Sequence, residues 1–559
     1  MLKYSAVCVA VLVLLGAPMA GASAAPAAVG SHPTHQSLAA AIDAAIGAHY
    51  KANEPGATVI VVKDGKTVFR KAYGMADTAA QKPMSPDMVL RLGSITKQFT
   101  ATAILMLAEE GKLALTDDIT RFFPDYPSGG KRITVEHLLT HTSGIVSYTG
   151  KPGYMGGMAK DMSVAAMIDS FKNDPLEFEP GTDYRYNNSG YFLLGAIVEK
   201  VSGQSYATFV ANRLFKPLGM NDTAHEGHER GKAPRALGHS RDGDGYGRSA
   251  PLSMTQPYAA GSLVSTVDDL ARWDAAIANG KLLKAASWRR AFTPYTLASG
   301  KPTDYGYGWE MGKLQGTATA GHGGGINGFS TYALRVPEHK VFVAVLSNAD
   351  GGLVSPGMVA TRAAAIAIGK PLREFKEIAL DGATLERFTG VYDIAKPTVR
   401  TFRRNGDTLV MQRTGRPPVT MKAYSPTGFF IPNSLDYFEF GQDAKGVVTH
   451  VTQYHDGNAL RQARIGDAPP ERAAARIANA SFDTRVGRYQ LAPGFELALS
   501  RDGDRYFAHA TGQGRLEIFP QSETVFFARA VEAEVRFDGA DSSYLVLHQN
   551  GQQIRAPKL

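Results

Sequence analysis

The feature that most constrains the fold of this chain is a change in sequence pattern near Glu374. Before this residue, apolar runs with helical spacing alternate with β-rich runs. After it, short β-rich segments alternate with turn residues at about ten-residue spacing, which is typical of small barrels or sandwiches. A chain of 559 residues is also too long for one hydrophobic core. We therefore predict an α+β domain over residues 30–375, followed by all-β modules.

The all-β part repeats itself weakly. Residues 388–392 resemble residues 485–489, and residues 404–407 resemble residues 501–504 at the same offset. Between the two copies, residues 467–480 are rich in alanine and proline, which is typical of a linker. The repeat therefore predicts two related barrel-like modules. We place them at residues 376–466 and 481–559.

β-rich runs lie near both ends of the predicted α+β domain. Residues 57–63 and 66–70 flank Asp64-Gly65, a strong signal for a hairpin. A second pair of runs occupies residues 331–336 and 341–346. We therefore expect one antiparallel sheet that joins the two ends of the domain, with a helical region inserted between them. The expected helices cover residues 35–50, 94–110, 164–173, 190–201, 206–214 and 355–368.

One of these helical runs begins at Ser94 and stops at Gly111. Lys97 lies on the same face as Ser94, because side chains at i and i+3 are neighbours on a helix. Burial lowers the pKa of a lysine, so that the neutral amine can accept a proton from the serine. Backbone N–H groups at the helix start can stabilise an oxyanion. The pair therefore predicts acyl transfer by a Ser-x-x-Lys motif.

The Ser-x-x-Lys spacing by itself is common. A second match, from Ser128 to Lys131, contains two glycines and follows Pro127, which is typical of a turn. By local spacing alone, Ser94 could instead be a helix N-cap and Lys97 a solvated charge on the helix surface. The other motifs of the chain decide between these interpretations.

The N-terminal residues have the pattern of a secretory signal peptide. Lys3 precedes a short apolar run, and small residues follow this run up to Ala25. The run is too short to span a bilayer, and no later run is long enough either. The only cysteine, Cys8, lies inside it, so a mature chain would have no thiol for a disulfide or a thiolate metal site. We therefore expect residues 1–25 to be removed on export to the periplasm or beyond.

The composition argues against several other functions. The net charge is +8, but lysine and arginine are scattered, which favours solubility and mild attraction to anionic cell-envelope material over nucleic-acid binding. His225 and His228 have the wrong spacing for a zinc helix. Residues 323–328 spell a dinucleotide fingerprint, but we expect a strand after them where that motif needs a helix. We therefore expect no metal, no cofactor and no nucleic-acid partner.

Two further motifs follow Ser94 in a fixed order. Tyr186-Asn187-Asn188 precedes an apolar helical run, and His322-Gly323-Gly324 precedes a strand. With Ser94 and Lys97, these motifs make the chain resemble the serine β-lactamase/penicillin-recognising superfamily, in particular its class C β-lactamase, esterase and D-aminopeptidase branch. The resemblance covers about residues 35–370. Supporting stretches are residues 141–144, 261–270 and 305–309.

The resemblance implies a fold and a set of catalytic roles. The fold is an antiparallel sheet flanked by helices, and the trailing β modules are similar to the paired barrels of D-aminopeptidases. Ser94 would attack a carbonyl group, while Lys97 and Tyr186, as a phenolate or through a shared hydrogen bond, would move its proton. No metal takes part in this chemistry.

The resemblance also implies residues that bind the substrate. Asn188 would donate to a substrate amide oxygen, unless it serves the turn before the following helix. His322 and Gly324 would line the pocket opposite Ser94, with His322 in contact with the substrate or the oxygen of Tyr186. Class C β-lactamases have Lys-Thr-Gly where this chain has His-Gly-Gly. The missing lysine and threonine would clamp a β-lactam carboxylate, so their loss favours an esterase or a peptidase.

The expected function is therefore that of an exported serine hydrolase acting on small esters, amides or D-amino-acid peptides, including cell-wall peptides. A peptidoglycan D,D-carboxypeptidase or D-aminopeptidase and a class C-like β-lactamase remain as alternatives. So does a slow-turnover penicillin-binding or sensing protein that is acylated and stalls. The β modules carry no recognisable chemistry and are expected to be spacers or partial lids, with an adhesion role as a weaker option.

Overall fold

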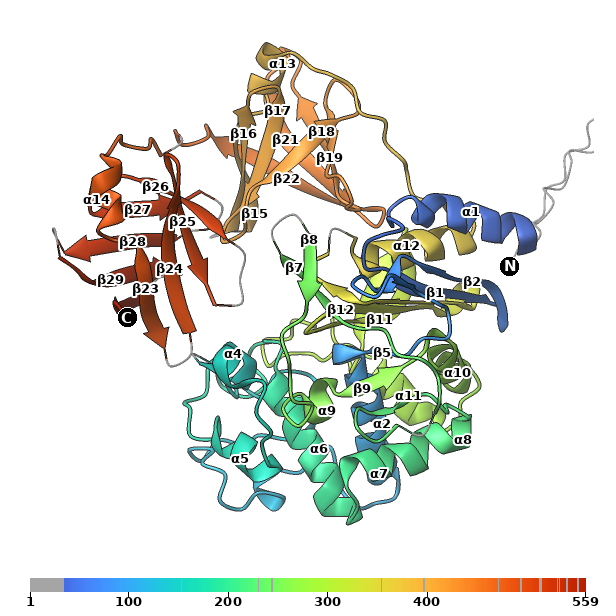
Figure 1. Ribbon diagram of the computed structural model, residues 1–559. Coiled ribbons are helices and arrows are strands. Elements are labelled where there is room, and N and C mark those ends of the chain that lie inside the picture. Colours follow the sequence, from blue (N-terminus) through green and yellow to red (C-terminus); the bar gives the residue numbers. More distant parts are fainter. Residues whose placement is uncertain are drawn as a thin grey trace, which may run out of the picture.

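The computed structural model describes residues 35–559, except residues 152, 230, 243–244, 353, 396–397, 471, 493–494, 512–514, 530, 532, 539–540 and 550–551. The expected signal peptide and its cysteine lie outside the described residues. An α+β domain is followed along the chain by two all-β domains of eight strands each (Figure 1). This order of domains confirms the expected fold class.

A six-stranded sheet in the order β10-β11-β12-β13-β1-β2 organises the α+β domain. β1 pairs antiparallel with β13, so the sheet joins strands from both ends of the domain, as predicted. The hairpin between β1 and β2 turns at Asp64 and Gly65, which both have the positive φ that a tight hairpin turn needs. The strands are β1 (Ala57–Lys63), β2 (Lys66–Tyr73), β10 (Glu310–Leu314), β11 (Thr317–Ile326), β12 (Phe329–Val336) and β13 (Val341–Ser347).

The glycine-rich motif at His322 precedes a strand, β12, as predicted, and the motif itself lies inside the preceding strand, β11. Glycine has a low preference for strands, so local sequence does not reveal β11. Pairing with β10 on one side and β12 on the other holds this segment in the sheet.

Helices cover both faces of the sheet (Figure 1). α1 (His35–Gly47) and α12 (Pro356–Ala367) pack on one face, where Ile42 and Val359 share a core with β1 and β13. The other face carries the inserted helical region around α2 (Thr96–Glu109) and α6 (Asn188–Ser202), which has its own core. No helix among the described residues combines the length and apolarity needed to cross a bilayer. The other helices of this domain are α3 (Val135–Leu139), α4 (Tyr154–Gly157), α5 (Val164–Asp169), α7 (Tyr206–Val210), α8 (Lys216–Leu218), α9 (Tyr258–Gly261), α10 (Val267–Ala278) and α11 (Ala285–Ala291).

Short strands connect these helices. β5 and β6 both pair with β9, and this small sheet leads the chain into the segment that carries Ser94. The short strands are β3 (Met75–Asp77), β4 (Lys82–Pro83), β5 (Leu90–Arg91), β6 (Ala224–His225), β7 (His239–Asp242), β8 (Gly245–Arg248), β9 (Leu263–Ser265) and β14 (Ala349–Asp350).

The first all-β domain, called here the first barrel, is a closed barrel of strands β15 to β22. The second barrel is an eight-stranded sheet from β23 to β30, whose first and last strands meet at a bridge between Tyr489 and Lys558. A short helix precedes each barrel, α13 (Gly382–Glu386) and α14 (Asn479–Asp483). The strands are β15 (Gly390–Ala395), β16 (Thr398–Asn405), β17 (Thr408–Arg413), β18 (Val419–Ala423), β19 (Gly428–Phe430), β20 (Tyr437–Gln442), β21 (Val448–His455), β22 (Asn458–Gly466), β23 (Gly487–Ala492), β24 (Phe495–Asp502), β25 (Arg505–Ala510), β26 (Leu516–Pro520), β27 (Val525–Ala528), β28 (Ala533–Asp538), β29 (Asp541–Gln549) and β30 (Gln552–Pro557).

The two barrels share the detail that the sequence repeat indicates. In the first barrel the buried Tyr392 hydroxyl donates to the carbonyl oxygen of Phe388 at 3.1 Å. In the second barrel Tyr489 makes the same contact with Arg485 at 2.7 Å. The repeated residues therefore form the same hydrogen bond at the start of the first strand of each barrel, β15 and β23.

The first barrel touches the edge of the central sheet. The backbone N–H of Gln315, in the turn between β10 and β11, donates to the carbonyl oxygen of Asp456 at 2.8 Å. The amide of Asn458 donates to the carbonyl oxygen of Lys313 at 3.2 Å. The hairpin between β21 and β22 therefore covers the turn at the open edge of the sheet.

Candidate active site

Ser94 lies in a single 3₁₀ turn, η1 (Gly93–Ile95), that leads directly into α2. Gly93 has a φ of 55°, and a Cβ atom there would lie only 3.0 Å from the backbone nitrogen of Gly325 in β11. The turn therefore holds Ser94 against the sheet. Ile95 is the N-cap of α2 and no side chain caps this helix, so the interpretation of Ser94 as an N-cap is wrong.

Lys97 follows in the first turn of α2 and is fully buried. Its Nζ atom lies 3.0 Å from Ser94 Oγ, 2.9 Å from Asn188 Oδ1 and 2.9 Å from the carbonyl oxygen of Ala260. Burial holds the pKa of Lys97 well below its ordinary value, while the charge of Glu310 opposes this shift. The interpretation of Lys97 as a solvated surface charge is therefore wrong.

The neighbours of Lys97 fit a neutral amine. The Ala260 carbonyl and the Asn188 side-chain oxygen can only accept hydrogen bonds, so each takes one N–H of the lysine. A neutral amine then keeps its lone pair for the third neighbour, the Ser94 hydroxyl. This geometry allows the serine proton to move to the lysine.

The two asparagines of the second motif have different surroundings. Asn187 is the N-cap of α6, and its Oδ1 accepts the N–H of Gly190 at 2.7 Å. Asn188 is the first residue of the helix, and its Nδ2 donates to Thr149 Oγ1 at 3.1 Å. The turn chemistry therefore belongs to Asn187, and Asn188 faces Lys97.

Tyr186 completes the group around Ser94. Its ring centre lies 4.8 Å from Lys97 Nζ, and its phenol lies beside the Ser94 hydroxyl. Desolvation raises the pKa of Tyr186 and the contact with Ser94 opposes this shift, although 36% of the residue remains exposed. The phenol is therefore protonated at neutral pH. The structure thus brings Ser94, Lys97 and Tyr186 together.

His322 lies on β11 behind Tyr186, with the two ring centres 6.0 Å apart. Its Nδ1 is 2.5 Å from the Gly323 carbonyl oxygen, which can only accept, so Nδ1 carries the hydrogen. Its Nε2 accepts from the Tyr305 hydroxyl at 2.8 Å. Burial lowers the pKa of His322 to about 3, so the ring is neutral. Both ring nitrogens thus have hydrogen-bond partners, Tyr305 and Gly323.

Gly324 is required for packing. A Cβ atom at this position would lie 2.0 Å from the Leu92 carbonyl oxygen and 2.2 Å from Thr331 Oγ1. Thr331 Oγ1 itself donates to that carbonyl at 2.7 Å. Only glycine therefore lets β11 approach the segment that carries Ser94 this closely.

The sequence analysis missed one backbone group of this site. The Gly323 N–H donates to the carboxylate of Glu310 at the end of β10. Because alternate residues of a strand point their N–H groups to the same side, the Gly325 N–H points the same way, beyond the last paired residue of β10. Its nitrogen also lies against the turn that carries Ser94. The backbone of Gly325 therefore lies beside the turn that carries the nucleophile.

The ring of a buried histidine, His141, packs against the ring of Tyr186. His141 has a φ of 59° and 1% of its surface exposed, and its Nδ1 accepts the Asn187 N–H at 3.1 Å. Its ring centre lies 4.3 Å from that of Tyr186 and 4.6 Å from that of Tyr305. The sequence signal was the stretch at residues 141–144, which carried no assigned role.

No group of three or more His, Cys, Asp or Glu side chains that could hold a metal ion occurs among the described residues.

This fold and this arrangement define a class, the serine acyl-transfer enzymes that use a buried lysine where other serine hydrolases use histidine. The Beta-lactamase family matches residues 38–368, which is more than half of the chain. The chain belongs to this family.

Relatives agree with this assignment. The chain is 30% identical over 521 residues to penicillin-binding protein 4* of Bacillus subtilis strain 168, covering 89% of this chain and 94% of that protein. It is 30% identical over 351 residues to the D-aminopeptidase of Gluconobacter oxydans strain 621H, covering 60% and 64%. The solved structure of an octameric penicillin-binding protein homologue from Pyrococcus abyssi is similar with a TM-score of 0.54 and 28% identity, over 76% of this chain and 99% of that one. The chain is thus a serine hydrolase with penicillin-binding and D-aminopeptidase relatives.

Proposed function

We propose that this chain is an exported hydrolase that forms an acyl intermediate on Ser94 and acts on small esters, amides or D-amino-acid peptides. The observation that carries the proposal is the environment of Lys97. This amine is buried, is surrounded by two obligate acceptors, and has the Ser94 hydroxyl as its third neighbour. These contacts support Lys97 as the group that takes the serine proton.

In the acylation step, Ser94 Oγ forms a bond to the substrate carbonyl carbon and its proton moves to Lys97. The resulting ammonium lies 4.8 Å from the ring centre of Tyr186 and 5.5 Å from that of Tyr191, which favours the cation. The N–H groups of Ser94 and Gly325 are suited to stabilise the oxygen that becomes negative.

The bond to the leaving group then breaks. The protonated Tyr186 phenol is suited to give its proton to the departing amine or alcohol, and Lys97 restores that proton. Water attacks the acyl-serine in the second half of the reaction, and its proton follows the same groups in reverse. Ser94 is released with the carboxylic acid product.

The substrate preference rests on the motif of β11 and on one relative. The chain lacks the lysine and threonine that would hold a β-lactam carboxylate. The ring of His322 is already hydrogen-bonded to Tyr305 and to the carbonyl oxygen of Gly323. A D-aminopeptidase is among the relatives. Both points favour D-amino-acid amides, peptides and small esters over β-lactams. The pattern of residues 1–25 supports export.

Intact mass after incubation with a fluorophosphonate tests the nucleophile. We expect a single adduct on the wild-type protein and none on Ser94→Ala. Ser128→Ala is the matched control, because Ser128 begins the second Ser-x-x-Lys match and lies in a turn. It should be labelled like the wild type. A labelled Ser94→Ala protein would contradict the proposal.

Turnover separates the candidate functions. For p-nitrophenyl esters and D-amino-acid p-nitroanilides we expect steady hydrolysis, and Ser94→Ala should lower kcat/KM by roughly a thousandfold or more. With penicillin, a stoichiometric burst and a persistent adduct without ester or anilide turnover would instead favour the slow-turnover penicillin-binding function, which the name of one relative suggests.

A further inference from the structure

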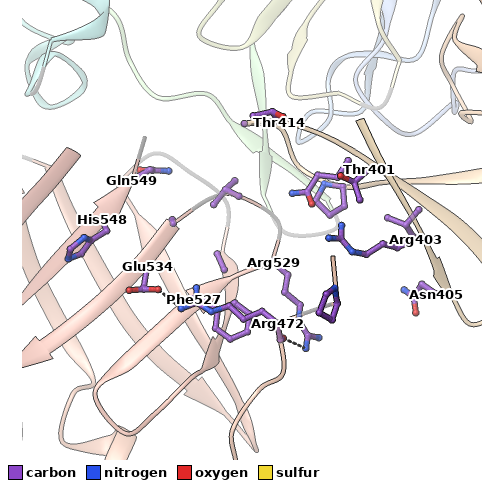
Figure 2. A pocket seen from close by; sticks show the side chains of 18 of the residues that line it. Thr401, Arg403, Asn405, Thr414, Arg472, Phe527, Arg529, Glu534, His548 and Gln549 are labelled. Atoms are coloured by element: carbon purple, nitrogen blue, oxygen red, sulfur yellow. Dashed lines mark hydrogen bonds and ion pairs between the residues drawn. The ribbon is translucent and has the colours of Figure 1, made fainter. Parts of the chain in front are cut away.

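A cavity of 1080 Å³ lies between the first and the second barrel (Figure 2). Strands β16 and β17 of the first barrel form one wall, and strands β27 to β30 with part of the linker form the other. Figure 2 shows Arg403 of the first barrel, Arg472 of the linker and Arg529 of the second barrel among the residues that line it. The described lining residues all come from the two barrels and their linker, so this cavity is separate from the site at Ser94.

The lining is strongly basic. Among its described residues are five arginines and a single acidic residue, and one of these arginines, Arg404, pairs with Glu386 outside the lining at 3.1 Å. Glu534 is shared by Arg472 at 2.5 Å and by Arg536, so one carboxylate serves two guanidinium groups. Arg403 instead donates to the neutral carbonyl oxygen of Pro469 at 3.2 Å. The positive charge of the cavity is therefore only partly compensated by the protein.

The rest of the lining is suited to hydroxyl groups. Side-chain amides both donate and accept hydrogen bonds, as sugar hydroxyls do. The described lining residues include two aromatic rings, the buried Phe527, which Arg472 covers at 4.5 Å, and the half-buried imidazole of His548. The amide and hydroxyl side chains are Thr401, Asn405, Gln412, Thr414, Gln549, Gln552 and Gln553.

We propose that this cavity binds an acidic glycan, meaning a sugar chain that carries carboxylate or phosphate groups. The arginines would pair with the anionic groups and the amides with the hydroxyls. Single-stranded nucleic acid fits less well, because its binding sites use exposed aromatic rings to stack the bases. A volume of 1080 Å³ exceeds about 1,000 Å³, the upper end of ordinary small-molecule pockets, and suits several sugar units.

Binding to the full-length protein, measured by calorimetry at two salt concentrations, tests the proposal. The probes are hexagalacturonate, which carries carboxylates, and a phosphomannan fragment, which carries phosphates. We expect at least one of them to bind and its affinity to fall as salt rises, because salt screens the arginines. Comparing the carboxylate probe with the phosphate probe identifies the acidic group that the cavity prefers. Neutral cellohexaose should not bind.

Other outcomes would overturn the proposal. These are the absence of binding by both acidic probes, equal binding of cellohexaose, or tighter binding of a twelve-nucleotide oligothymidylate. The last result would assign the cavity to nucleic acid.

A matched pair of variants locates the site. Gln553→Glu adds a negative charge to the cavity wall at an exposed position of β30 and leaves the size of the side chain unchanged. We expect it to weaken binding of the acidic probe about tenfold. Gln490→Glu makes the same change on an exposed position of β23 outside the cavity and should bind as the wild type does. Thermal unfolding shows that both variants are folded, and equal affinities of the two variants would refute the site.

Discussion

At the scale of single residues, the site depends on a lysine that is kept neutral by its surroundings. Desolvation lowers the pKa of Lys97, and the carboxylate of Glu310 is the group that raises it. Glu310 also accepts the Gly323 N–H, so it touches the strand beside the nucleophile. The two effects oppose each other, and their balance sets the pH at which the amine can accept a proton.

The Glu310→Gln variant tests this balance. If neutral Lys97 takes the serine proton, kcat/KM rises as the pH passes the pKa of Lys97. Removing the negative charge of Glu310 lowers that pKa, so the acidic limb of the pH profile should move to lower pH. Ester hydrolysis measured across a series of buffers gives the pH profile of kcat/KM for the wild type and each variant.

The control is Glu338→Gln, the same change in the exposed turn η5 (Pro337–His339). Its limb should coincide with that of the wild type. An unmoved or upward-shifted limb in Glu310→Gln would show that the amine is not the group that controls the acidic side.

At the scale of elements, the close approach of β11 to η1 decides where the oxyanion groups lie. Gly324 meets the Leu92 carbonyl, and Gly93 meets the backbone of Gly325. The strand and the turn are thus in contact through backbone atoms at both positions. A side chain between them would separate Ser94 from the Gly325 N–H.

Gly324→Ala should therefore destabilise the protein and slow the reaction. Its Cβ would overlap the Leu92 carbonyl, and overpacking of this kind reduces the free energy of unfolding by about 1–3 kcal/mol. Urea unfolding gives the stability, and ester hydrolysis gives the activity.

Gly325→Ala is the control for stability, because its Cβ would meet nothing within 4 Å. We expect its unfolding free energy to stay within about 0.5 kcal/mol of the wild type. Equal stability of the Gly324 variant and this control would show that the approach is looser than the structure indicates.

At the scale of the whole molecule, the hairpin between β21 and β22 of the first barrel contacts the edge of the catalytic sheet. Gly457, between β21 and β22, has a φ of 81°, and a Cβ there would lie 2.8 Å from the side chain of Gln315. This contact and the neighbouring hydrogen bonds join the two domains, together with Leu435, which packs against the core of α1 and α12, and with the exposed connecting residues around Glu374.

Gly457→Val should loosen this junction. We expect trypsin to cut the connecting segment at Lys370, Arg373 or Lys376 about three- to tenfold faster, because local opening exposes the backbone. Gly503→Val is the control, since Gly503 also has a positive φ but faces open space. Equal cleavage rates in the two variants would mean that backbone strain, and not the contact with Gln315, sets the rate.

Much of this architecture could be predicted from local sequence. The hairpin at Asp64, the change to all-β modules after Glu374 and the repeat around Tyr392 and Tyr489 all follow from short-range patterns. The pairing of β11 with β10 and β12 could not be predicted from local sequence, because its glycines have a low strand preference.

The sequence by itself determined that Ser94 and Lys97 face each other, because residues three apart on a helix share a face whatever surrounds them. Only the tertiary structure decided that Asn188 faces Lys97, that His322 is engaged by Tyr305, and that two barrels enclose a basic cavity. Each of these depends on contacts between segments far apart in the chain. Such contacts are set by how the elements pack, and no local spacing of residues encodes them.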